Sequence, residues 1–138
     1  MSRKKTIAVV GTFDTKGKEL SYIKDVIESL GADTLCIDTG IFETDFDIDI
    51  TCGELAREVD ADIHKLRERN DRGENVDTQC RALEKLLPRL YAEDKIDAAI
   101  SAGGSGGTSI VAPAFRALPI GVPKIIVSTM AASSTGHT

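Results

Sequence analysis

Apolar residues follow two patterns that alternate along the chain. Short runs rich in Val, Ile and Ala are typical of strands buried on both faces of a parallel sheet. Apolar residues that recur every three or four positions are typical of helices with one buried face. The runs predict four strands, at residues 5–10, 33–38, 97–102 and 124–128.

Between these strands the spacing predicts helices. The first runs from about Leu20 and ends at Gly31, a residue that commonly terminates helices. Further helices are predicted at residues 54–59, 63–69, 74–92 and 108–118. Because proline lacks the backbone N–H that a helix interior uses, Pro88 should bend or break its helix, and Pro113 should lie near a first turn or kink the chain.

This alternation predicts an α/β fold with a doubly wound parallel sheet, Rossmann-like or flavodoxin-like, in which helices on both faces make a three-layer sandwich. The simplest strand order is 2-1-3-4, with the helix after strand one on one face and the helix after strand three on the other. No linker or repeat divides residues 1–138, so we expect a single domain. Ligands of such sheets bind beyond the carboxyl ends of the strands, where the chain reverses direction.

The segment from residue 39 to residue 70 is less regular. Residues 45–50 alternate acidic and apolar side chains, as expected for an extended, half-exposed stretch. The acidic side chains of this segment lack the glycine spacing of a calcium loop, and we expect a solvated face. They are Glu43, Asp45, Asp47 and Asp49. His64 is expected to be a surface or cap residue.

Composition narrows the classes of function. The 138 residues carry a net charge of −5 and 4% aromatic residues with no Trp, which argues against a nucleic-acid partner. No apolar run approaches the roughly 18 residues of a membrane span or forms a signal-peptide core. We therefore predict a cytoplasmic protein with neither a membrane nor a nucleic-acid partner.

Three cysteines and two histidines lie far apart in the sequence. Cys36, Cys52 and Cys80 are an odd number without a close pair, and His64 and His137 are 73 positions apart by their numbering (137 − 64). This spacing favours free thiols in a reducing compartment, and it predicts neither a disulfide framework nor a metal site.

The third predicted strand leads into a glycine-rich junction, Gly103, Gly104, Ser105, Gly106 and Gly107, followed by Thr108. With so few side chains, backbone N–H groups and a helix N-terminus carrying about half a positive charge can approach a phosphate closely. The junction predicts an anion or phosphate site, and the alternative is a tight strand-to-helix turn. It matches the standard dinucleotide fingerprint only weakly, because Ser109 stands where the last glycine should be.

The first predicted strand ends in Gly11, Thr12, Phe13, Asp14, Thr15 and Lys16. This is not a Walker A loop, because Lys16 occupies the second glycine position and Glu19 follows Lys18. Lys16 could neutralise a phosphate, Thr12 and Thr15 could donate to its oxygens, and Asp14 could hold Mg²⁺ or a ribose hydroxyl. Alternatively, Asp14 or Thr15 caps the following helix and Lys16 is solvated.

Two further strand ends complete the predicted crevice. Asp38 ends the second strand, where doubly wound nucleotide binders often place an acidic residue for ribose hydroxyls, although carboxylates at strand ends are also common without a ligand. Ser128, Thr129 and Met130 end the fourth strand and would line the same rim.

The motifs after strands one, three and four together resemble the Tm-1-like ATP-binding family, UPF0261. The resemblance rests on residues 11–16, 101–108 and 127–131 and covers essentially the whole chain. It implies an ATP-binding domain whose nucleotide-facing residues are Gly11, Thr12, Asp14, Thr15 and Lys16, with 103–108. Members are longer and have a second α/β domain, so we expect this chain to be the N-terminal part of a two-domain protein.

We therefore expect ATP, with or without Mg²⁺, as the ligand of a domain that regulates, or supports a reaction completed by, a C-terminal domain. No catalytic residue is identifiable, and the sequence does not distinguish an enzyme from a binding protein. Two alternatives remain open: an enzyme domain for a small phosphorylated or carboxylated metabolite, and an oligomerisation module. Without its partner domain the chain should expose an apolar face, which favours a homo-oligomer.

Overall fold

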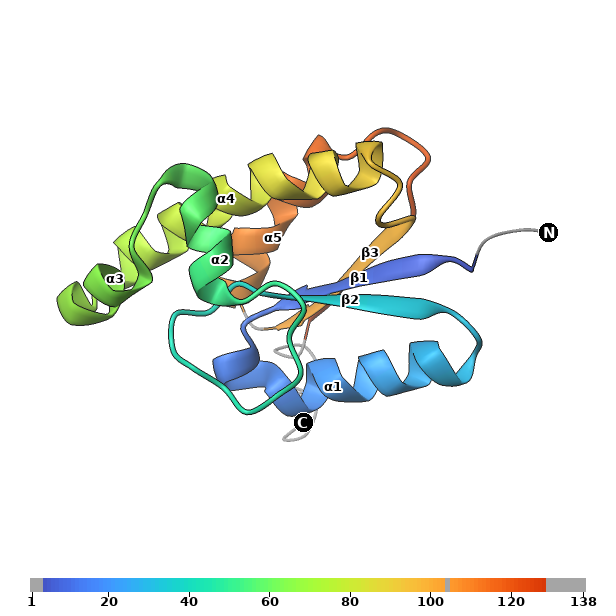
Figure 1. The fold of residues 1–138 in the computed structure, drawn as a ribbon, viewed down its shortest axis with the longest axis horizontal. Helices are drawn as coiled ribbons and strands as arrows, with labels where there is room; N and C mark the ends of the chain where they lie inside the picture. Colours follow the sequence, from blue (N-terminus) through green and yellow to red (C-terminus); the bar gives the residue numbers. More distant parts are fainter. Residues whose placement is uncertain (1–3, 104, 129–138) are drawn as a thin grey trace, which may run out of the picture.

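Four parallel strands form the centre of the molecule (Figure 1). The computed structural model describes residues 4–103 and 105–128. The strands are β1 (Thr6–Gly11), β2 (Asp33–Asp38), β3 (Ala98–Gly103) and β4 (Lys124–Ser128). Their order is β2-β1-β3-β4, which confirms the predicted doubly wound α/β class and the 2-1-3-4 topology.

Helices cover both faces of the sheet, as Figure 1 shows. They are α1 (Phe13–Ser29), α2 (Cys52–Ala56), the 3-10 turn η1 (Arg57–Val59), α3 (Ile63–Arg69), α4 (Arg72–Ala92) and α5 (Ser105–Ala117). Helix α1 packs on one face, and α4 and α5 pack on the other. This confirms the predicted placement of the helices after strands one and three.

Alternate residues of each strand serve the two faces. In β1, Val9 packs toward α1 in a cluster with Phe13 and Leu20, whereas Ala8 and Val10 pack toward α4 and α5. All five side chains are buried. Both faces of β1 therefore exclude water, which explains why its sequence is an almost continuous apolar run.

The helices that follow β1 and β3 start earlier than predicted. Helix α1 begins at Phe13 rather than near Leu20, because the buried Phe13 ring anchors the first turn. Lys16 leaves helical geometry there, with φ −121° and ψ 25°. Helix α5 begins at Ser105 rather than 108, so Gly106 and Gly107 belong to its first turn. Tertiary packing against α4 outweighs the low helix propensity of glycine.

The shorter helices follow their local capping signals. Thr51 and Glu54 form a reciprocal capping box that starts α2 at residue 52, two residues before the prediction. The helix predicted at 54–59 is divided between α2 and η1. Helix α3 has the predicted bounds, and its N-cap Asp62 accepts from the His64 N–H, which places His64 in a capped first turn. Pro113 lies inside α5 and not near its first turn, because the helix begins early.

The irregular segment at residues 39–50 runs back along the outer edge of β2. Ile50 forms a bridge to Ile37, and the N–H groups of Asp49 and Ile50 both donate to the Cys36 carbonyl at 3.0 Å. Asp49 also accepts from the Cys36 N–H at 2.7 Å through its side chain. The predicted alternation is confirmed, since Asp45, Asp47 and Asp49 are exposed while the apolar residues between them are half-buried.

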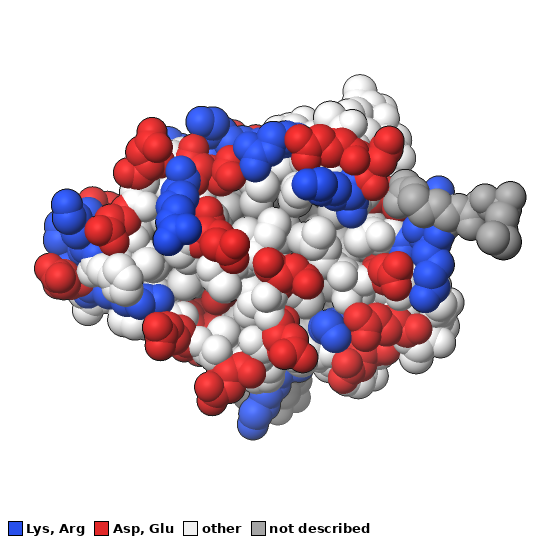
Figure 2. Space-filling view, viewed as in Figure 1, with Lys and Arg blue, Asp and Glu red and all other residues white. Residues whose placement is uncertain are grey.

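The three cysteines are free, as predicted: Cys36 and Cys52 are buried and Cys80 is half-buried. Burial raises the pKa of the Cys36 thiol to about 12, so this thiol stays protonated at neutral pH. Among residues 4–103 and 105–128, no helix is long and apolar enough to cross a membrane. On the face shown in Figure 2, basic and acidic side chains are interspersed.

Candidate functional site

The carboxyl ends of the strands bring the predicted loops to one edge of the sheet. Gly11 of β1 lies opposite Asp38 of β2, and Gly103 of β3 lies opposite Ser128 of β4. The structure therefore places four of the predicted site positions at this edge. Gly104, Thr129 and Met130 lie outside the described residues.

Asp38 is a deeply buried polar residue, with 2% of its surface exposed. Its Oδ1 accepts from the N–H of Gly40 at 2.8 Å and from the N–H of Phe13 at 3.2 Å. Asp38 thereby caps α1 from the neighbouring strand, while the N-cap residue Thr12 makes no side-chain cap bond. Sequence reasoning missed this role because it considered only capping residues adjacent to the helix.

Burial raises the pKa of Asp38 to about 6. The N–H groups of Gly40 and Phe13 stabilise the charged form and limit the rise, whereas the nearby Asp14 carboxylate adds to it. The carboxyl group is therefore poised to change its charge just below neutral pH.

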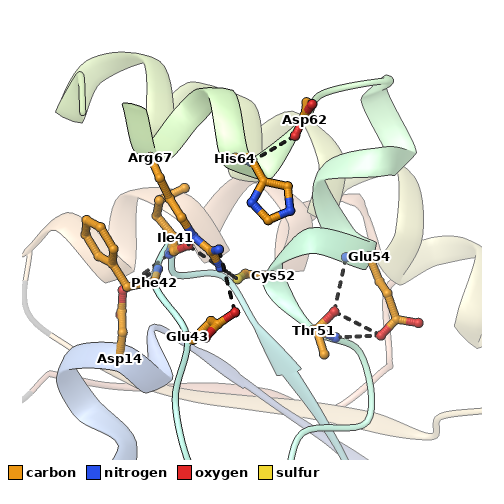
Figure 3. A network of polar contacts seen from close by, with 10 residues as sticks. All are labelled: Asp14, Ile41, Phe42, Glu43, Thr51, Cys52, Glu54, Asp62, His64 and Arg67. Atoms are coloured by element: carbon orange, nitrogen blue, oxygen red, sulfur yellow. Dashed lines mark hydrogen bonds and ion pairs between the residues drawn. The ribbon is translucent and has the colours of Figure 1, made fainter. Parts of the chain in front are cut away.

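Asp14 connects α1 to the loop after β2. Its Oδ2 accepts from the N–H groups of Ile41 and Phe42, each at 3.2 Å (Figure 3). Its Oδ1 is buried and has no hydrogen-bond partner among the described residues. Gly40 is required here, because a Cβ at that position would lie 2.5 Å from Oδ1. Asp14 therefore holds the loop with one oxygen, and its other oxygen is buried beside Gly40 without a partner among the described residues.

The hydroxyl groups of Thr12 and Thr15 lie 2.9 Å apart and share a hydrogen bond. The Nζ of Lys16 is 4.0 Å from the Oε2 of Glu19, a distance too long for a strong ion pair. These three side chains follow β1 directly, and the two threonine hydroxyls pair with each other rather than with a distant element of the described chain.

The glycine-rich junction is shorter than the predicted five-residue loop. Strand β3 ends at Gly103 and α5 begins at Ser105, so the first backbone N–H groups of a 13-residue helix follow the strand end almost immediately. The first N–H groups of any helix lack partners within that helix. The arrangement is thus suited to receive an anion at the edge where Gly11 and Asp38 also lie.

A second feature of this edge was not predicted. Beyond β2 lies a hollow of about 410 Å³, between the 39–51 segment and helices α2 and α3. Its walls include Asp38, Glu43, Phe46, His64 and Arg67. Arg67 comes from α3, far along the chain from β2, and nothing in the spacing of its neighbours predicts a role at this position.

Two carboxylates, Asp14 and Asp38, come together at this edge. Within the part of the chain that the structure describes, no group of three His, Cys, Asp or Glu side chains could hold a metal ion by itself. Mg²⁺ that arrives with a nucleotide needs only one or two protein carboxylates, because phosphate oxygens and water supply the remaining ligands. Asp14 and Asp38 supply that number of carboxylates, but Asp38 is buried, and the Oδ1 of Asp14, buried and unpartnered among the described residues, would have to become exposed to reach the ion.

The fold defines a doubly wound α/β domain, a class in which ligands bind at the carboxyl ends of the strands. Residues 5–138 match the N-terminal domain of the uncharacterised protein family UPF0261, and the chain belongs to this family. This finding confirms the resemblance drawn from the three loop motifs.

Three curated relatives illustrate the similarity. A UPF0261 protein of Clostridium tetani is 41% identical over 132 residues, which is 95% of this chain and 33% of the relative. A UPF0261 protein of Mesorhizobium japonicum is 39% identical over 131 residues, covering 95% and 32% of the two chains. The ToMV resistance protein Tm-1(GCR237) of Solanum lycopersicum is 33% identical over 147 residues, covering 91% and 19%. This chain thus spans about a third of the length of the bacterial relatives.

Proposed function

We propose that this domain binds ATP at the carboxyl ends of β1 and β3, with its phosphates against the first turn of α5. The observation that carries the proposal is the direct passage from Gly103 into a helix at the point where the sheet topology reverses. The same position binds phosphate groups in many doubly wound folds. The family resemblance is the reason for choosing ATP among phosphorylated ligands.

The residues around this turn supply complementary chemistry. Helix N-H groups and a dipole of about half a positive charge favour phosphate oxygens, and Lys16 adds a full charge. The hydroxyl groups of Thr12 and Thr15 can donate to the same oxygens. Oδ1 of Asp14 is buried without a partner among the described residues, and on becoming exposed it would accept from a ribose hydroxyl or bind Mg²⁺, which would neutralise part of the phosphate charge.

The remaining predictions concern the whole protein. Because the bacterial relatives are about three times as long as this chain, we propose that a C-terminal domain uses or responds to the bound nucleotide. Self-association of the domain and a cytoplasmic location remain part of this proposal. The described residues do not identify a catalytic group, so binding is the activity to test first.

The test is a calorimetric titration with ATP, with and without Mg²⁺. We expect saturable binding that Lys16→Ala weakens about tenfold, the loss expected for one charge-assisted contact. Lys24→Ala is the matched control, because Lys24 lies on the same helix but pairs with Glu28 at 3.3 Å, away from the crevice. Gly106→Val, in the first turn of α5, should abolish binding by crowding the phosphate position.

Two results would contradict the proposal. One is a titration without heat in which ATP also fails to raise the melting temperature. The other is an equal loss of affinity in Lys16→Ala and Lys24→Ala, which would indicate a non-specific charge effect.

A further inference from the structure

The hollow beyond β2 contains an arginine that is held in place from one side. The Nε of Arg67 donates to the Ile41 carbonyl at 2.6 Å, and the side chain is 21% exposed. This contact joins α3 to the loop after β2 and restricts the guanidinium to one orientation (Figure 3). A ligand that pairs with Arg67 would therefore not have to immobilise a flexible side chain.

The terminal nitrogens of this guanidinium have weak partners. One lies 3.8 Å from the Sγ of Cys52, and a thiol is a poor hydrogen-bond acceptor. The other is 3.9 Å from the Oε1 of Glu43, whose side chain is 88% exposed. Among the described residues, Glu43 is the only carboxylate within ion-pair distance of Arg67. Its exposure means that it can move away at small cost.

The space around the guanidinium suits a small organic ligand. Its volume of about 410 Å³ lies within the range of small-molecule sites. Phe42, Phe46, Ile48 and Ile63 supply apolar walls, and the His64 ring points from α3 toward the start of α2 (Figure 3). Arg67 is the only Lys or Arg among the described lining residues, and Asp38, which also lines the hollow, accepts from the N–H groups of Gly40 and Phe13. Apolar walls beside an oriented guanidinium favour a ligand that has an apolar body and one negative group.

We propose that this hollow is a second ligand site that binds a small carboxylic acid, with the carboxylate against the terminal nitrogens of Arg67. The planar guanidinium matches the two oxygens of a carboxylate, and the apolar walls accommodate the remainder of the acid. Glu43 occupies the carboxylate position loosely in the free protein and is displaced by the ligand. The hollow shares Asp38 with the predicted nucleotide site, but the proposal does not depend on ATP binding.

The test is an NMR titration of the protein, without nucleotide, using benzoate, benzamide and inorganic phosphate as probes. Benzamide has the ring but not the charge, and phosphate has the charge but not the ring. We expect benzoate to bind more tightly than either and to shift the signals of residues around Arg67.

Variants locate the interaction. Glu43→Gln removes the competing carboxylate and should tighten benzoate binding about two- to fivefold, the value of an exposed ion pair. Arg67→Lys retains the charge but loses the planar fork, and it should weaken binding at least about tenfold. Asp77→Asn is the matched control, because it removes the exposed partner of Arg81, 3.0 Å away on α4, and should leave benzoate affinity unchanged.

The outcomes separate clearly. Unchanged benzoate affinity in Glu43→Gln would overturn the proposal, and this variant keeps the test valid even if Arg67→Lys fails to fold, because the Glu43 side chain is exposed. Equal affinity for benzoate and benzamide would show that the charge is not recognised. Tighter binding of phosphate than of benzoate would overturn the assignment of a carboxylate.

Discussion

The two lateral edges of the sheet, formed by the outer strands β2 and β4, differ in how the chain covers them. Along the β2 edge, the 39–50 segment returns and is tied down by backbone bonds to Cys36 and by the carboxylates of Asp14, Asp38 and Asp49. At the β4 edge, the described residues leave Ile125 56% and Val127 45% exposed. A shallow apolar hollow of about 480 Å³ separates Val127 from Tyr22 of α1.

The difference separates two kinds of surface. The β2 edge is closed by polar contacts whose side chains also belong to the candidate sites, so the stability of this edge and the binding proposed for it involve the same side chains. The β4 edge has apolar side chains that make little use of burial in the described part of the chain. Substitutions should therefore change the free energy of unfolding strongly at the β2 edge and weakly at the β4 edge.

The largest loss of stability is expected on substitution of Gln79, which links α4 to the β2 edge. Its side chain is fully buried, and its Nε2 donates to the carbonyls of Gly40 at 2.8 Å and Cys52 at 3.2 Å. Gln79→Ala removes both bonds and leaves a cavity, and it should lower the free energy of unfolding by about 2–4 kcal/mol, measured by urea denaturation. Gln79→Met keeps the side-chain volume and should recover only the part of this loss that is due to the cavity. Wild-type stability in Gln79→Met would show that the two bonds do not hold the edge.

The next largest expected effect is a pH dependence of the stability, caused by the ionisation of Asp38. Its pKa is raised to about 6 in the folded protein, compared with roughly 3.9 in an unfolded chain, so the folded state binds the proton more tightly. The resulting stabilisation is complete below about pH 4 and is lost as the pH rises through about 6, for a total of roughly 2–3 kcal/mol.

Asp38→Asn retains an oxygen acceptor for the N–H groups of Phe13 and Gly40 but cannot ionise. Its stability should therefore exceed that of the wild type increasingly from about pH 4 to about pH 7, as urea denaturation at several pH values would show. A difference between the two proteins that stays constant over this range would rule out Asp38 as the source.

The smallest change in stability is expected for substitutions at the β4 edge. Ile125→Thr should change the free energy of unfolding by no more than about 0.5 kcal/mol, because the side chain is already largely in water. The same substitution at the fully buried Ile37 of β2 provides the contrast and should cost several times as much. If sedimentation shows that the protein self-associates, Ile125→Thr should weaken that association. A similar loss of stability at both positions would remove the distinction between the edges.

The strands and their order were predictable because each run of apolar residues needs two covered faces, and only a parallel sheet between helices supplies them. The helix starts were less predictable. Phe13 begins α1 through burial of its ring, and Gly106 and Gly107 enter α5 despite their low helix propensity. In both cases contacts with distant elements outweigh the local preference of the chain.

The α/β class, the strand order and the set of polar residues that follow each strand can be derived from the amino-acid pattern, because the period of the apolar positions sets which side chains are covered. The contacts of those polar residues are visible only in the folded chain. Asp38 caps a helix that begins 25 residues earlier, Asp14 binds the backbone of Phe42 28 residues later, and Arg67 reaches Ile41 across 26 residues. Local spacing sets the face on which a side chain lies, whereas its partner is set by whichever backbone group the folded chain brings to that face.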